Sequence, residues 1–92
     1  MQTAQTKLII EYYDSTSVRG VFNKPDVMRC LYDPALVAEY GADTLWQRWK
    51  SDPLNSKRKV RHVWVEMWSR NQSDKVWCLR SARTLFQEKT SA

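Results

Sequence analysis

The stretch that decides the fold is residues 60–80, VRHVWVEMWSRNQSDKVWCLR. From Val60 to Ser69 the side chains alternate with the period of two that is typical of a β-strand. One face carries Val63, Val65 and Met67, and the other carries His62, Trp64, Glu66 and Trp68. Residues 71–74 are turn formers, and residues 75–80 run back as a second strand. The pattern predicts a β-hairpin.

A hairpin that closes between Arg70 and Lys75 also fixes which residues face each other. It sets Trp68 opposite Trp77, Met67 opposite Cys78 and Glu66 opposite Leu79. Facing tryptophans stabilise a hairpin by about 0.5–1 kcal/mol relative to alanines. Both faces of the hairpin are apolar, and a small domain covers only one of them easily, so we expect the other to be partly open to a partner. The alternative is that the tryptophans pack beneath helices.

The N-terminal part predicts a second hairpin. Residues 7–13 are rich in Ile and Tyr, which favours a strand with Leu8, Ile10 and Tyr12 on one side. Ile9, Glu11 and Tyr13 then lie on the other side. Residues 14–17 form a turn cluster, after which residues 18–23 are expected to return as a strand.

The middle of the chain carries helix signals. Asp26 can cap a short helix with Val27, Cys30 and Leu31 on one face. Asp33-Pro34 is a stronger start, because Asp caps and Pro fits the first helical position. The helical positions that follow are Leu36, Val37 and Tyr40, and Asp43 can cap a continuation with Leu45, Trp46 and Trp49 in the core. Ser51-Asp52-Pro53 ends this segment. Residues 81–89 are expected to form a short helix or an extended arm.

Length and composition fit one small domain. The chain has 92 residues, 42% of them hydrophobic, and no apolar run long enough to cross a membrane. We predict a single α+β domain over residues 1–92, with flexible ends at 1–6 and 90–92. An antiparallel sheet that includes the 60–80 hairpin packs with helices from residues 26–50. The polar start and the absence of a signal-peptide core lead us to expect a cytoplasmic protein.

Charge divides the chain into two halves. Four basic and six acidic residues precede Gln47, a balance of −2, whereas eleven basic and four acidic residues follow, a balance of +7. This asymmetry favours nucleic acid or an acidic protein as partner. The candidate binding cations are Lys57, Arg58, Lys59, Arg61, Arg70, Lys75, Arg80 and Arg83. Trp64, Trp68 and Trp77 are candidates for aromatic contact with unpaired bases.

Enzyme signatures are weak. The single histidine, His62, lies mid-strand with no residue spaced to orient it as a general base. Two glycines cannot form a phosphate-cradling loop, and Cys30 and Cys78 lack the spacing of a zinc site. We expect two buried, reduced cysteines, no catalytic residues, no metal and no cofactor.

The sequence as a whole resembles a family of small phage-encoded proteins that act against bacterial defence. It is similar to the anti-CRISPR inhibitors of type I-F systems, within them the eighth numbered family. The resemblance runs through MQTAQTKLIIEYYDS, LYDPALVAEYGADTLWQRWK and VRHVWVEMWSRNQSDKVWCLRS (residues 1–15, 31–50 and 60–81), and rests on no separate motif. It implies a non-enzymatic α+β protein in the host bacterial cytoplasm.

The resemblance also implies a partner. The expected partner is the guide-RNA surveillance complex, through its Cas backbone subunits and the guide RNA (crRNA), so that target DNA cannot hybridise. Neither a membrane nor a small-molecule substrate is expected. One alternative is a winged-helix DNA-binding regulator or excisionase-like phage protein, in which the 60–80 hairpin is the wing. Another is a plain interaction module with a solvated basic face.

Overall fold

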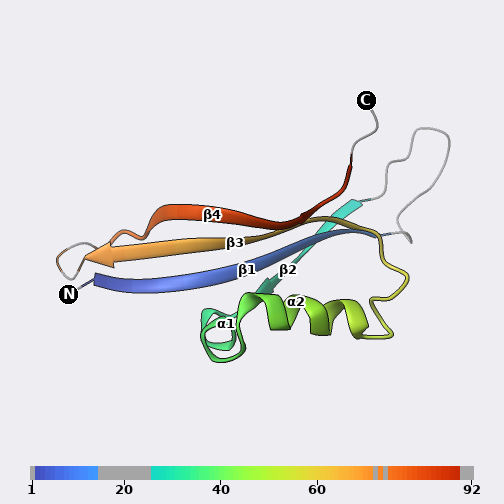
Figure 1. Ribbon diagram of the computed structural model, residues 1–92. Helices are drawn as coiled ribbons and strands as arrows, with labels where there is room; N and C mark the ends of the chain where they lie inside the picture. The colour runs from blue at the N-terminus through green and yellow to red at the C-terminus, as the bar shows by residue number, and fades with distance from the viewer. Residues whose placement is uncertain (1, 15–25, 72, 74, 90–92) are drawn as a thin grey trace.

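The protein is an α+β domain with one sheet and two helices. The computed structural model describes residues 2–14, 26–71, 73 and 75–89. In chain order the elements are β1 (Gln2–Asp14), β2 (Asp26–Tyr32), α1 (Pro34–Tyr40), α2 (Ala42–Ser51), β3 (Val60–Asn71) and β4 (Cys78–Gln87). The strand order is β2-β1-β3-β4, and all neighbours are antiparallel. Both helices lie on the same side of the sheet (Figure 1).

The core forms between the helices and the centre of the sheet. Leu8 faces Val65 and Ile10 faces Val63 across β1 and β3, as the alternation in both segments predicts. Four helical side chains close over them, namely Val37, Leu45, Trp46 and Trp49. Trp46 and Trp49 stack with ring centroids 5.9 Å apart, so the prediction that they belong to the core is confirmed. Full burial stabilises each such side chain by about 1.5–3 kcal/mol.

The helix pair begins where the Asp33-Pro34 signal predicts. The Asp33 carboxylate accepts a hydrogen bond from the Ala35 amide at 2.8 Å, and Pro34 opens α1. Gly41 separates the helices with φ 87° and ψ 146°, a conformation that glycine adopts readily and other residues rarely do. Asp43 lies within the first turn of α2, so the prediction that it caps this helix is wrong.

The short helix predicted from Asp26 is also wrong, because residues 26–32 form β2. This strand pairs with β1 from Leu8↔Tyr32 to Asp14↔Asp26. The apolar residues of this segment fit helical spacing rather than strict alternation, but the long strand β1 supplies backbone hydrogen-bond partners along its whole length. Pairing with a distant segment therefore overrides the local cap signal. The predicted strand over residues 18–23 lies outside the described residues.

The C-terminal segment is a strand rather than a helix. β4 pairs with β3 from Ser69↔Cys78 to His62↔Gln87, with two register shifts on the way. Trp68 faces Leu79 and Met67 faces Ser81, so the predicted pairing of Trp68 with Trp77 is wrong. The connection is longer than a turn closed at Arg70 and Lys75, because β4 begins only at Cys78.

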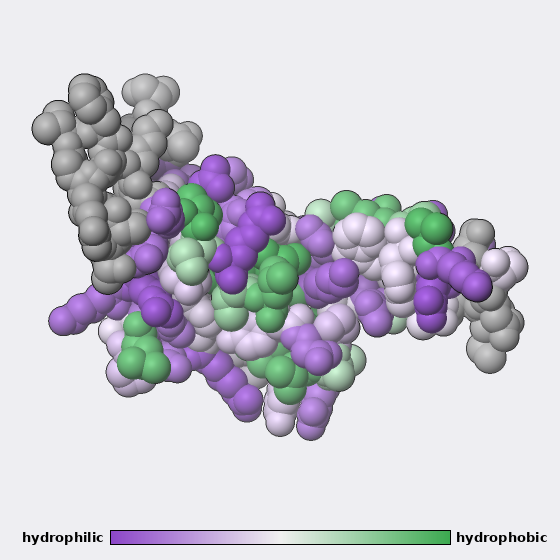
Figure 2. Space-filling model, turned by 180° about the vertical axis from the view of Figure 1, so that it is seen from behind, coloured by the Kyte–Doolittle hydropathy of each residue, from purple (hydrophilic) through white to green (hydrophobic). Residues whose placement is uncertain are grey.

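One end of the sheet extends beyond the helices. Residues 2–6, expected to be a flexible end, pair with residues 67–71 of β3. Together with the start of β4 they form an overhang, defined here as residues 2–6, 67–71 and 78–82, which neither β2 nor the helices cover (Figure 1). Seen from behind, it projects as a narrow end with apolar and polar side chains mixed (Figure 2). The molecule is elongated, with extents of 53 × 27 × 24 Å.

Candidate nucleic-acid and partner interface

The side of the sheet away from the helices carries the tryptophans of β3. Side chains alternate along a strand, so Trp64 and Trp68 lie opposite in direction to Val63 and Val65, which face the helices. Both rings are half-buried. The alternative prediction, that they pack beneath the helices, is therefore wrong for these two residues. We call this side the tryptophan face.

Glu66 holds both rings in place. It lies between them on β3, and its carboxylate accepts hydrogen bonds from the indole Nε1 of Trp64 at 2.7 Å and of Trp68 at 3.0 Å. A charged acceptor makes such bonds stronger than neutral ones. The two indole donors are thus satisfied by the protein itself, and the orientation of each ring is fixed before any partner arrives.

Cations from β1 and β2 lie over the rings. The Lys7 ammonium is 4.8 Å from the Trp68 centroid, and the Arg29 guanidinium is 5.9 Å from that of Trp64. The His62 ring also contacts Trp64, with ring centroids 4.5 Å apart, and its Nε2 is 3.3 Å from the Thr84 hydroxyl. The tryptophan face therefore combines flat aromatic surface with positive charge.

A buried carboxylate organises the next row of the same face. Glu11 is 4% exposed and accepts from Arg29 Nε at 2.7 Å and Arg61 at 3.1 Å. Arg61 was predicted to bind a partner, but the structure pairs its guanidinium with this carboxylate. The pairing orients Arg29 and Arg61 along the face while it neutralises part of their charge.

The basic run at residues 57–59 is also partly engaged. Arg58 donates to Asn55 Oδ1 at 2.6 Å and lies 4.8 Å from the Tyr12 ring. Lys59 is 3.9 Å from a Glu88 carboxylate oxygen. Lys57 is exposed, and it makes no hydrogen bond or ion pair to any residue that the structure describes. Only part of this run is free for an anionic partner.

Glu88 ties the C-terminal end of β4 to this region. It accepts a short hydrogen bond from the Tyr13 hydroxyl. This bond, together with the negative charge of Glu88, raises the pKa of Tyr13 above its usual value.

The remaining predicted cations lie elsewhere. Arg70 lies 4.9 Å from the Trp77 ring, near the end of the hairpin, where Lys75 is exposed. Arg80 donates to Ser69 Oγ at 2.7 Å, and Arg83 lies opposite Val65. The eight predicted cations therefore form three groups on or beside the β3–β4 hairpin: one at the start of β3, one near the turn, and one along β4.

The prediction that both cysteines are buried is wrong. Cys30 is half-buried against the core, whereas Cys78 is exposed at the start of β4. Both are free thiols. Burial raises the pKa of the Cys30 thiol.

Sequence reasoning missed Lys7, Arg29, Glu11 and Glu66. The spacing Trp64-x-Glu66-x-Trp68 was a usable signal for Glu66, because alternate residues of a strand share a face. Lys7 and Arg29 reach the tryptophans only because β1 lies next to β3, with β2 on the far side of β1. No local spacing contains that information.

No protein-family model, curated protein or solved structure matches this chain. Within the described ranges, no three His, Cys, Asp or Glu side chains are grouped so that they could hold a metal ion. No helix among the described residues is long and apolar enough to span a membrane.

Proposed function

We propose that the protein is a non-enzymatic inhibitor that occupies a type I-F guide-RNA surveillance complex and prevents target DNA from pairing with the guide. The observation that carries this proposal is the tryptophan face. The overall sequence resemblance to type I-F anti-CRISPR inhibitors supplies the class of partner. The setting of this action is the bacterial cytoplasm.

The tryptophan face suits unpaired nucleotides. A four-stranded antiparallel sheet with helices on one side leaves the other side available, and exposed aromatics on such a sheet can stack bases. Each stacked base contributes about 1–3 kcal/mol. Glu66 holds Trp64 and Trp68 in fixed orientations, which reduces the entropy lost on binding.

The cations above the rings supply the second half of the interaction. Lys7 lies over Trp68 without an ion pair to any described residue, and its stem is flexible. A base that stacks on Trp68 would displace the Lys7 ammonium toward the neighbouring phosphate. The protein would thereby replace part of the attraction that target DNA feels for the channel of the complex.

The test is retention of a purified type I-F guide-RNA complex on the tagged protein at about 150 mM salt, because electrostatic binding depends on ionic strength. We expect retention by the wild type and exclusion of target DNA. The double variant Trp64→Leu/Trp68→Leu should lose at least about tenfold in affinity, given the stacking energies above. Tyr40→Leu is the matched control, since it removes another exposed aromatic with a cation, Arg48, at 4.7 Å.

Reversal of the basic run is a poorer test. Arg61→Glu would set a second carboxylate against the buried Glu11 and damage the fold. Intact circular dichroism with unchanged retention by the tryptophan variant would remove the tryptophan face from the proposal.

The winged-helix alternative keeps one observation in its favour, the helix pair directly before the β3–β4 hairpin. Its recognition helix would be α2, but Leu45, Trp46 and Trp49 of this helix are buried against the sheet. A gel shift on random duplex DNA, run beside the retention experiment, separates the two proposals. A shifted duplex without retention of the guide-RNA complex would favour the regulator.

A further inference from the structure

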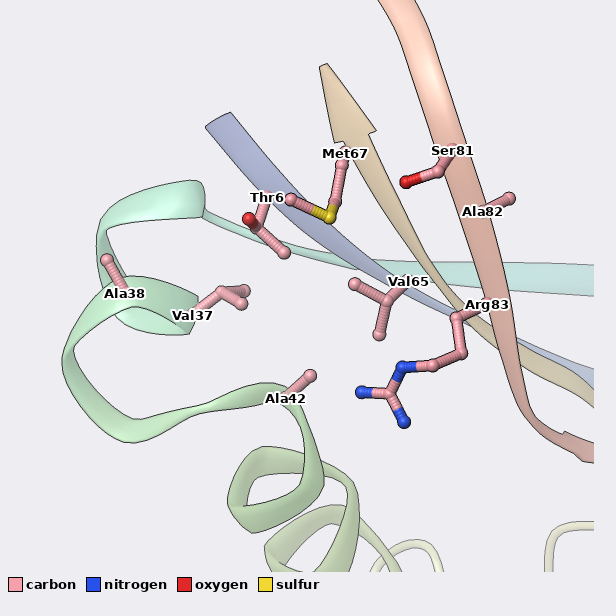
Figure 3. Close-up of a pocket in the computed structure, with 9 residues that line it drawn as sticks. All are labelled: Thr6, Val37, Ala38, Ala42, Val65, Met67, Ser81, Ala82 and Arg83. Carbon is pink, nitrogen blue, oxygen red and sulfur yellow. The ribbon is translucent and has the colours of Figure 1, made fainter. Parts of the chain in front are cut away.

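A pocket of about 400 Å³ lies on the helix side of the sheet, opposite in direction to the tryptophan face. Its helical wall comes from Val37, Ala38 and Ala42, and its strand wall includes Val65 and Met67 (Figure 3). The pocket lies at the boundary between the overhang and the part of the sheet that the helices cover. Its volume falls within the range of about 300–1,000 Å³ that is usual for binding pockets.

The lining is mostly apolar, with Thr6, Ser81 and Arg83 as its polar residues, and it is partly adaptable. Ala38 and Ala42 are small, which leaves the space between α1, α2 and the sheet unfilled. Met67 is 50% exposed at the strand wall, and methionine side chains adjust readily to the shape of a partner. These side chains offer apolar contact inside the pocket and at its strand wall.

One charged group enters this apolar space. The Arg83 guanidinium extends from β4 into the gap toward Ala42 (Figure 3). It makes no hydrogen bond or ion pair to any residue in the described part of the chain, and no acidic residue lines the pocket. A guanidinium beside an apolar surface favours a carboxylate as its partner, because a charge-assisted bond is stronger there than in open water.

We infer that this pocket is a protein-docking site that accepts an apolar side chain with an Asp or Glu beside it in the partner. The apolar side chain fills the space between Ala38 and Met67, and the carboxylate pairs with Arg83. A protein segment can also cover the exposed Met67 at the wall of the pocket. The inference adds to the proposed function a second contact, on the other side of the sheet from the tryptophans, suited to a protein subunit of the complex.

The experiment titrates the ¹⁵N-labelled protein with two capped dipeptides, N-acetyl-Leu-Glu-amide and N-acetyl-Leu-Gln-amide. We expect amide shift changes at Val37, Ala42, Val65 and Arg83, with the Glu peptide binding about tenfold more tightly, the usual effect of a hydrogen bond to a charged group. In Arg83→Gln the two peptides should bind equally. Ala38→Leu fills the pocket and should abolish the shifts with both peptides.

Lys89→Gln is the charge-matched control, because Lys89 is exposed and lies outside the pocket lining. It should retain the preference of the wild type. Absence of shifts at the pocket amides, or equal binding of both peptides to the wild type, would overturn the inference. The titration uses neither RNA nor the surveillance complex, so its failure is distinguishable from failure of the proposed function.

Discussion

Glu11 is a buried carboxylate that, among the described residues, forms ion pairs with two cations from other strands, Arg29 and Arg61. Removal of the carboxylate leaves both guanidinium groups without this acceptor, and the two cations then repel each other. We expect Glu11→Ala to lower the free energy of unfolding by about 2–3 kcal/mol, below the full cost of breaking a deeply buried pair because both arginines are partly solvated. Urea denaturation measures it, with the exposed Glu39→Ala as control. Equal losses in the two variants would contradict this role.

Tyr13 gives the stability a dependence on alkaline pH. Its hydrogen bond to Glu88 raises the pKa of the folded-state phenol above the usual value near 10. A raised folded pKa means that this stabilisation is fully present below the unfolded pKa and is lost as pH rises through the folded pKa. We expect the urea midpoint to fall above pH about 10, with a smaller fall in Tyr13→Phe. Tyrosinate absorbance should show one fewer late-titrating tyrosine in this variant, whereas Tyr32, whose pKa burial also raises, should titrate late in both proteins.

The two thiols should react at different rates. Cys78 is exposed, whereas Cys30 is half-buried and burial raises its pKa, so less of it is thiolate at neutral pH. We expect a disulfide reagent such as Ellman's to modify Cys30→Ser, which retains Cys78, at least about tenfold faster than Cys78→Ser at pH 7.5. Urea should abolish the difference. Equal rates in the folded protein would show that Cys30 is as accessible as Cys78.

The junction between the helices depends on one glycine. Gly41 has φ 87°, and a Cβ added there would meet no atom within 4 Å, so any cost of Gly41→Ala comes from the backbone alone. Such a conformation costs a non-glycine residue about 1–3 kcal/mol. Thermal or urea unfolding should show this loss for Gly41→Ala. Ala42→Gly, the neighbouring exchange between the same residue types, tests ordinary helix propensity and should cost at most about 1 kcal/mol.

At the level of elements, the sequence predicts what depends on local alternation and caps. The faces of β1 and β3, the Asp33-Pro34 helix start and the core tryptophans of α2 follow from spacing within a few residues. The segment over residues 26–32 does not, because its local pattern favours a helix and only pairing with β1 makes it a strand. The register of β4 fails for the same reason, since its two shifts arise along the pairing with β3.

The candidate site shows a similar division. Trp64 and Trp68 were identified from the sequence because an alternating strand with two apolar faces leaves one of them to a partner. The engagement of Arg61 by Glu11, and the place of Arg83 in the pocket, depend on strand neighbours far apart in the chain. A count of cations along the sequence therefore overstates the charge that is free to bind phosphate.

Along its long axis, the molecule has two parts that differ in how many strands the sheet has and in whether helices cover it. Around Leu8, Ile10 and Val63 the sheet has four strands and a cover of helices. In the overhang it has three strands and no helix, with Met67 and Leu79 about half exposed. The free energy of local opening depends on buried apolar contacts, so the overhang should open without unfolding the core.

Amide hydrogen exchange tests this difference. We expect residues 3–5 and 69–70 to exchange at least about tenfold faster than Leu8, Ile10 and Val63, after correction for intrinsic rates. Val37→Ala removes a buried side chain of α1 and should destabilise the domain by about 1–3 kcal/mol. If the overhang opens locally, this variant accelerates exchange in the core and leaves the overhang rates unchanged. If both regions accelerate by the same factor, the domain opens as one unit, and the overhang would then present its side chains to a partner as a rigid extension of the sheet.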